Sequence, residues 1–119
     1  MPHPDPEQYT SAWCGRSTKV ILDFYAENAF SIVNDGAPVV GHVAMSEAMQ
    51  GFIDTFPDLE IRMEAFRATN TAAVYVWRLL GTHITTGRSV DLEGWEAWRL
   101  NTNGKIVEIR GYFDPDEYA

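Results

Sequence analysis

Residues 59–66, LEIRMEAF, alternate apolar side chains with the charged side chains of Glu60, Arg62 and Glu64. A period of two is typical of a β-strand that is buried on one face and solvated on the other. Further strand-like segments follow at 72–85, 89–100 and 105–114, and the turn pair Asn103-Gly104 joins the last two. This half of the chain therefore predicts a meander of antiparallel strands.

The preceding half of the chain favours helices. Asp5 with Pro6 and Glu7 is typical of a helix start, which predicts a helix over 6–14. A second helix is expected from about Ser17, and a third from about Val43 to Phe56, where Pro57 ends it. Between the second and third helices, a short strand over 30–33 runs into a turn. The second helix carries apolar residues at helical spacing, which are Val20, Ile21, Phe24 and Tyr25.

Helices that come first and antiparallel strands that come last indicate an α+β domain. We expect a cone-shaped α+β barrel in which the three N-terminal helices pack on a strongly curved antiparallel sheet. Bulges at Gly81, Gly94 and Gly111 are expected to create the curvature. The 119 residues predict one domain over 1–119, with residues 1–5 as a loose tail.

The formal charge of -8 argues against nucleic acid and anionic membranes as partners. No apolar run is long enough to span a membrane, and the start of the chain lacks signal-peptide features. Cys14 is the sole cysteine and cannot form an internal disulfide, so we predict a cytoplasmic protein. The histidines lack metal-ligand spacing and no phosphate-binding glycine loop occurs, so neither a metal nor a cofactor is expected. The exposed face of the curved sheet is expected to be apolar, which predicts a homodimer.

Four segments, taken in order, carry a resemblance to a known family. They are FYAENAFSIVNDGAPVVGHVA at 24–44, FIDTFPDL at 52–59, LLGTH with TGRSV within 79–90, and NGKIVE at 103–108 followed by Asp114. The chain resembles the SnoaL-like polyketide cyclases of the nuclear transport factor 2-like superfamily. The resemblance implies the cone fold and places the family's acid/base aspartate at Asp114. Two departures, a short loop after His83 and an arginine at position 110, argue against carrying over the family's substrate.

Three ionisable residues are candidates for the chemistry. Asp114 is the predicted acid or base, and the alternative is a turn cap before Pro115. His83 is predicted to bind a substrate oxygen or to pair with Asp114, and the alternative is a structural histidine with a local partner. Glu96 lies among apolar neighbours and is expected to be functional, protonated or paired with Arg78.

Aromatic residues are the candidate walls of a binding pocket, although they can equally form a filled core. The phenols of Tyr25 and Tyr112 are of added interest because a phenol can donate a hydrogen bond to a developing enolate. The predicted substrate-binding residues are Trp13, Tyr25, Phe56, Trp77, Glu96, Trp98 and Tyr112.

These observations predict a cyclase or isomerase type of protein that binds a hydrophobic, carbonyl-bearing small molecule. Its acid/base chemistry is expected to need no cofactor, with Asp114 moving the proton and His83 or Tyr25 steadying the oxyanion. One alternative is epoxide hydrolysis by Glu96 and Asp114 with Arg78 or Arg110. The other alternative is a non-catalytic module for small-molecule binding or dimerisation.

Overall fold

The first and third helices begin and end close to where the local sequence indicates, and the second begins at the expected residue. In the computed structural model, which describes residues 3–117, Asp5 accepts hydrogen bonds from two backbone N–H groups and starts α1 (Pro6–Cys14). Ser17 caps α2 (Thr18–Leu22) in the same way. The helix α3 (His42–Thr55) ends just before Phe56 and Pro57, which agrees with the predicted stop.

Six strands form one mixed sheet in the order β2-β1-β6-β5-β4-β3. The strands of the predicted meander pair antiparallel, whereas β1 pairs in parallel with β6 and antiparallel with β2. The sheet is not closed, because β2 and β3 lie at its two edges. The strands are β1 (Tyr25–Val33), β2 (Val39–Val40), β3 (Glu60–Ala68), β4 (Ala72–Thr82), β5 (Ser89–Leu100) and β6 (Ile106–Phe113), followed by a 3-10 turn at Pro115–Glu117.

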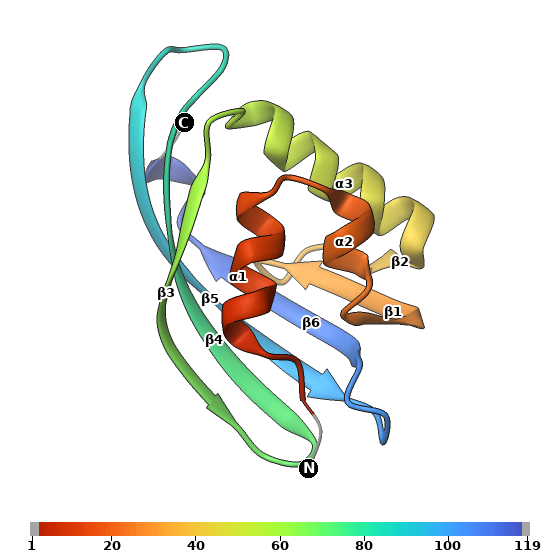
Figure 1. The fold of residues 1–119 in the computed structure, drawn as a ribbon. Coiled ribbons are helices and arrows are strands. Elements are labelled where there is room, and N and C mark those ends of the chain that lie inside the picture. The colour runs from red at the N-terminus through yellow and green to blue at the C-terminus, as the bar shows by residue number, and fades with distance from the viewer. Residues whose placement is uncertain (1–2, 118–119) are drawn as a thin grey trace.

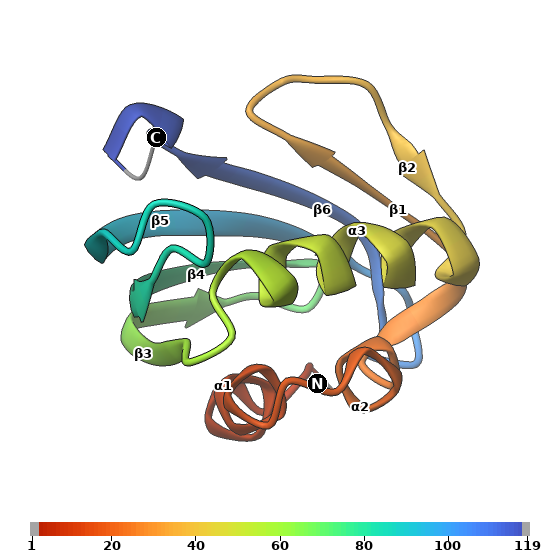
Figure 2. The same cartoon turned by 90° about the horizontal axis from the view of Figure 1, so that it is seen from above.

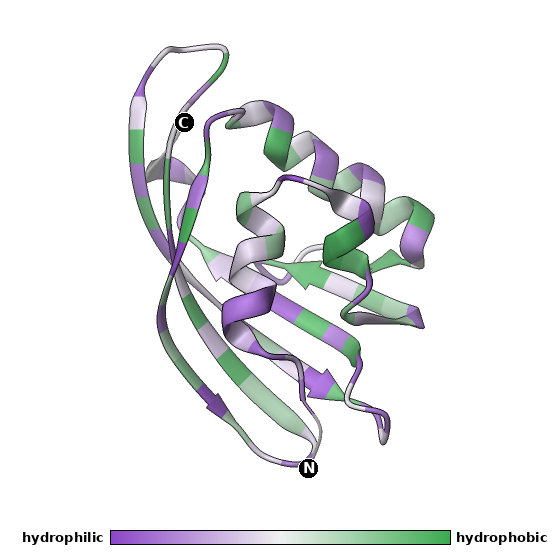
Figure 3. Ribbon diagram, viewed as in Figure 1, coloured by the Kyte–Doolittle hydropathy of each residue, from purple (hydrophilic) through white to green (hydrophobic). Residues whose placement is uncertain are grey.

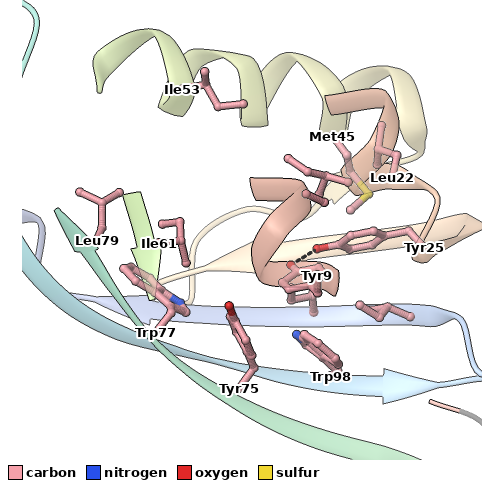
Figure 4. Packing of buried hydrophobic residues seen from close by; sticks show 14 of the residues in the cluster. Tyr9, Leu22, Tyr25, Met45, Ile53, Ile61, Tyr75, Trp77, Leu79 and Trp98 are labelled. Carbon is pink, nitrogen blue, oxygen red and sulfur yellow. Dashed lines mark hydrogen bonds between the residues drawn. The ribbon is translucent and has the colours of Figure 1, made fainter. Parts of the chain in front are cut away.

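The sheet curves around the helices, and all three helices lie on its concave side (Figures 1 and 2). Hydrophobic and hydrophilic residues alternate along the long strands (Figure 3), so that one face meets the helices and the other faces solvent. Buried residues of both layers form one core cluster, in which Trp98, Tyr9 and Tyr75 are among the largest fully buried side chains (Figure 4). The predicted α+β fold, with helices on a curved sheet, is confirmed.

Two local details differ from the expectation. The expected short strand over 30–33 begins earlier, at Tyr25, because that residue pairs with Ile106 of β6 instead of continuing the second helix. Tertiary pairing overrides the helical spacing here.

The expected bulges at glycines are also misplaced. Register shifts fall between Tyr25 and Phe30, between Met63 and Ala65, and between Arg99 and Leu100, whereas the three glycines pair in register. Gly94 serves close packing instead of bending: a Cβ there would lie 2.4 Å from Cζ2 of Trp77 and 2.7 Å from the carbonyl oxygen of Tyr112.

The predicted tail, residues 1–5, lies partly outside the described residues. Within them, Pro4 is buried, Asp5 caps α1, and the His3 ring lies 5.5 Å from the ring of Phe66. Among the helices of residues 3–117, none is both long and apolar enough to cross a membrane.

Candidate active site

A cavity of about 400 Å³ lies between α3 and the concave face of the sheet. Met45, Met49 and Phe52 of α3 form one wall, and the strands supply the opposite wall. Its lining is mostly apolar, with the carboxylate of Glu96 as the one acidic group. The site therefore combines a mostly apolar cavity with a single carboxylate, and a mainly apolar lining with few polar groups is typical of a small-molecule site.

The strand β5 places Glu96 in the middle of this concave face. Glu96 lies opposite Tyr75 of β4 and opposite Gly111 of β6 in the sheet register. Its side chain is half-buried. Because Gly111 has no side chain, and no atom lies within 4 Å of where its Cβ would be, the sheet leaves open space beside the carboxylate.

One oxygen of Glu96 is held by two donors from the protein. Tyr9 O–H and Trp98 Nε1–H both donate to Oε1, each at 3.0 Å. Tyr9 is fully buried on α1, and its ring packs edge-on against Trp98 at 4.8 Å between centroids. The other oxygen, Oε2, has no hydrogen-bond partner among the described residues, and the side chain lines the cavity. Oε2 is thus the oxygen available to a ligand.

A chain of hydrogen bonds leads from the cavity wall to the carboxylate. The hydroxyls of Tyr9 and Tyr25 lie 2.8 Å apart (Figure 4). Because the Tyr9 proton is donated to Glu96, the proton between the two phenols comes from Tyr25. Burial raises the pKa of both phenols well above the ordinary value, and the nearby carboxylate adds to this, so both stay neutral donors.

Burial raises the pKa of Glu96 from an ordinary value of 4.5 to about 7, although the hydrogen bonds from Trp98 and Tyr9 act in the opposite direction. A carboxyl group with this pKa is present in both protonation states near neutral pH. Such a group can accept a proton in one step of a reaction and return it in the next. With Oε1 occupied by two donors, the proton binds and leaves at Oε2.

A second phenol in the cavity wall also has its proton committed. Tyr75 lines the cavity, and its hydroxyl lies 2.5 Å from Oγ1 of Thr10. Thr10 donates its own proton to the Pro6 carbonyl, so Tyr75 is the donor between the two hydroxyls. Burial raises the pKa of Tyr75. Tyr75 therefore offers a ligand only an acceptor oxygen.

The structure brings four of the predicted site residues together. Trp13, Tyr25, Trp77 and Glu96 all line the cavity. Trp98 lies behind it, fully buried, and acts through its hydrogen bond to Glu96.

Two other aromatic residues of the predicted pocket lie elsewhere. Phe56 is buried in the core next to the ring of His83, at 5.7 Å between ring centroids. Tyr112 lies on the convex face, where its ring stacks on Trp95 at 5.4 Å and its hydroxyl donates to Asp35. Neither is part of the cavity lining.

Asp114 lies just beyond the end of β6, and its side chain is exposed. Its Oδ1 accepts a hydrogen bond at 2.9 Å from the backbone N–H of Asp116, which lies in the 3-10 turn Pro115–Glu117. Asp114 does not line the cavity. This geometry corresponds to the capping alternative, and a catalytic role of Asp114 stays a prediction without support from its position.

His83 follows β4 and belongs to the loop that leads to β5. Its Nδ1 accepts hydrogen bonds from the backbone N–H groups of Thr85 and Thr86, at 3.2 Å and 3.4 Å. The histidine thus organises its own loop, and it is absent from the cavity lining. Its predicted role toward a substrate oxygen likewise stays a prediction.

The expected pairing of Glu96 with Arg78 is wrong. Consecutive strand residues point to opposite faces, and Arg78 lies on the convex face, where it contacts carboxylates of Glu64, Asp91 and Glu93. The other arginine considered for epoxide hydrolysis, at position 110, pairs with Glu108 at 2.7 Å. The two carboxylates and arginine required for that chemistry therefore do not converge among the described residues.

Sequence reasoning missed Tyr9, which holds the carboxylate, and Ser31, Met45 and Phe113, which line the cavity. Tyr9 had an available signal, since it shares a side of its helix with Trp13 at a spacing of four residues. Ser31 had none, because its position in the wall depends on the parallel pairing of β1 with β6. Within residues 3–117, no three His, Cys, Asp or Glu side chains are grouped so as to hold a metal ion.

Comparisons with solved structures agree with this architecture. A candidate SnoaL-like polyketide cyclase from Jannaschia sp. superposes with a TM-score of 0.82 and 19% identity, over 91% of this chain and 81% of that one. A hypothetical protein with a ketosteroid isomerase-like fold from Catenulispora acidiphila, in complex with trimethylamine, gives 0.85 and 11%, over 98% and 90%. SalBIII, an epoxide hydrolase/cyclase-like enzyme of pyran ring formation in the polyether salinomycin, gives 0.80 and 16%, over 93% and 88%. At such low identities these likenesses establish the shared fold alone.

A search of curated proteins finds no significant match to this sequence. The sequence profile of one protein family does match this chain, over residues 7–109, which is most of its length. It is the family of SnoaL-like domains, and this chain belongs to it.

Proposed function

We propose that this protein binds a hydrophobic, carbonyl-bearing small molecule and moves a proton on it by cofactor-free acid/base chemistry, with Glu96 as the acid/base group. The observation that carries the proposal is the half-buried carboxylate of Glu96 in an otherwise apolar cavity. Burial raises the pKa of this group, and its Oε2 atom has no hydrogen-bond partner among the described residues. The acid/base role that the sequence predicted for Asp114 is thus assigned to Glu96, which lines the cavity.

The proposed step is proton transfer next to a carbonyl group. Ionised Glu96 removes a proton from the α-carbon through Oε2, the C–H electron pair enters the enolate, and the negative charge develops on the carbonyl oxygen. Glu96 then carries the proton at Oε2, where it exchanges with solvent, and returns a proton to a carbon of the same ligand, so the protein ends in its starting state. Tyr9 and Trp98 hold the carboxylate in place during both transfers through their bonds to Oε1.

The direct test is hydrogen exchange on a simple enolisable ketone. We expect the protein to accelerate the exchange of α-protons of 2-tetralone for deuterium in D₂O, followed by NMR. Glu96→Gln keeps the shape of the side chain and removes its base, so exchange should fall by a factor of at least about 100. Glu47→Gln, an exposed position on α3, is the matched control and should exchange at the wild-type rate.

Equal exchange rates for wild type and Glu96→Gln would refute the assigned acid/base role. If 2-tetralone binds and no protein-dependent exchange occurs, the second candidate function, a non-catalytic binding module, is supported instead. Asp114→Asn gives a separate check, because we expect it to keep the wild-type rate as a residue outside the cavity.

We also propose that the protein forms a homodimer through its convex face. Five residues, here called the convex patch, adjoin one another in the register of β4, β5 and β6. They are Val74, Val76, Trp95, Ala97 and Tyr112. Trp95 is 48% exposed and Val74 is 44% exposed, which leaves apolar area for a second copy to cover.

The cytoplasmic location of the protein stays a prediction.

A further inference from the structure

Trp77 carries a buried donor that the protein does not use. Its side chain lines the cavity and is 7% exposed. The indole nitrogen is shielded from solvent, and it has no hydrogen-bond partner among the described residues. A buried N–H without a partner destabilises the folded state, and in native structures it calls for an explanation.

The sheet prevents the indole from turning away to find a partner. Trp77 lies opposite Gly94 in the register of β4 and β5, and its six-membered ring occupies the space where a Cβ of Gly94 would be. Phe113 packs against the same indole, at 6.1 Å between ring centroids. The indole ring is therefore held in place by packing, and a ligand oxygen reaches its N–H once a neighbouring side chain that covers the nitrogen moves aside.

The indole is also placed next to the acid/base group. Trp77 lies opposite Gly94, and the next cross-strand pair on the same face is Tyr75 with Glu96, so Trp77 and Glu96 are diagonal neighbours. Such neighbours are about 7–8 Å apart at their Cα atoms. Figure 4 shows the nitrogen of the indole on the side toward Tyr75. Tyr75 is the residue that pairs with Glu96 across the strands.

The remaining polar groups of the wall are mainly acceptors. Tyr25 donates its proton to Tyr9, and Tyr75 donates its proton to Thr10, so both phenol oxygens can only accept from a ligand. An acceptor oxygen on the ligand is thus left with the indole N–H groups of Trp77 and Trp13, or with the hydroxyl of Ser31 on β1. Of the two indole nitrogens, that of Trp77 is the one that is buried without a partner among the described residues. Ser31 has no fixed hydrogen, since a hydroxyl rotates, whereas the indole donor is held in one direction.

We propose that the Trp77 indole N–H binds the carbonyl oxygen of the ligand and places its α-carbon at Oε2 of Glu96. A carbonyl oxygen and an α-carbon are two bonds apart, which suits two groups that are diagonal neighbours. The ligand class is accordingly an enolisable ketone with a hydrophobic body, and a hydrocarbon of the same shape is discriminated against. The placement of the α-carbon rests on the proposed function, whereas the binding of the oxygen does not.

The experiment compares 2-tetralone with tetralin, which has the same ring system without the oxygen. Calorimetric titration gives the ratio of the two affinities for each variant, and this ratio cancels general changes in packing. Trp77→Phe keeps an aromatic ring and deletes the N–H, so the ketone-to-hydrocarbon ratio should fall about tenfold. Trp95→Phe makes the same substitution on the convex face and should keep the ratio.

A spectroscopic readout reports the bond itself. The indole ¹H–¹⁵N signal of Trp77, assigned by its absence in Trp77→Phe, should shift downfield with 2-tetralone and shift less with tetralin. An unchanged affinity ratio in Trp77→Phe overturns the proposal, and so does a ratio that falls in Ser31→Ala instead. Failure of the wild-type protein to bind 2-tetralone also counts against it.

The two proposals fail in different ways. If Glu96→Gln keeps α-proton exchange while Trp77→Phe loses the preference for the ketone, the proposed function is refuted and the carbonyl-binding role of Trp77 stands. If Glu96→Gln abolishes exchange while Trp77→Phe keeps the preference, the role of Trp77 is refuted and the acid/base function stands.

Discussion

Replacing Glu96 with glutamine should remove a pH dependence of stability that arises at this one side chain. In the unfolded chain the carboxyl group titrates near its ordinary pKa of 4.5, and in the folded protein its pKa is raised to about 7. Well below pH 4.5 the carboxyl group is protonated in both the folded and the unfolded state, and well above pH 7 it is ionised in both. Between the two values the folded state keeps a proton that the unfolded chain has lost, so the contribution of Glu96 to the free energy of unfolding falls as pH rises.

The magnitude follows from the separation of the two pKa values. One pH unit between them corresponds to about 1.4 kcal/mol. The separation at Glu96 therefore corresponds to about 3 kcal/mol, lost from the wild-type protein between acid and mildly alkaline pH. Glutamine is neutral throughout and can still accept from Tyr9 and Trp98, so Glu96→Gln should not show this loss.

The assay is urea unfolding, followed by tryptophan fluorescence at several pH values from 4.5 to 8. The wild-type protein should lose stability relative to Glu96→Gln as pH rises, by about 3 kcal/mol across the range. Glu47→Gln changes the net charge by the same amount at an exposed site and should run parallel to the wild type. Parallel curves for Glu96→Gln and the wild type would show that the carboxylate is not perturbed by burial, which would refute the reasoning.

The remaining predictions concern rate, packing and assembly. The value of kcat/KM for α-proton exchange should rise with pH and level off above a midpoint near 7, because the ionised form of Glu96 is the base; a flat profile would contradict this. Gly94→Ala should lower the free energy of unfolding by about 2 kcal/mol in urea titrations, because the added methyl group collides with Trp77 and with backbone. Gly51→Ala, which meets open space in α3, should instead gain roughly 0.5–1 kcal/mol. Light scattering should show a dimer for the wild type and a monomer for Trp95→Glu, and a wild-type monomer would remove the dimer proposal.

Short-range patterns predicted most of the fold. The period-two alternation over 89–100 corresponds to the bounds of β5, and the cap at Asp5 corresponds to the start of α1. The parallel pairing of β1 with β6 lay beyond such patterns, because it joins segments about 80 residues apart. Period and caps report the local backbone, whereas strand order depends on which distant segments bury surface together.

The site shows the same limit at the level of single residues. Alternation along β5 correctly put Glu96 on the apolar face, yet its hydrogen-bond partner Tyr9 is 87 positions away and was not considered. Asp114 was favoured because of a family motif, but β6 ends at Phe113, and the next residue leaves the sheet. A motif fixes order along the chain and does not fix the direction of a side chain just beyond a strand end.

The open space at Gly111 allows the size of the cavity to change without a change in the surroundings of Glu96. Gly111 faces Glu96 across the strands, but it makes no bond to the carboxylate, to Tyr9 or to Trp98. A larger side chain there would narrow the cavity and leave Oε2 of Glu96 and the hydrogen bonds from Tyr9 and Trp98 to Oε1 in place. Under the proposed function, a substitution at Gly111 therefore changes which ligands fit the cavity while the proposed acid/base group keeps its environment.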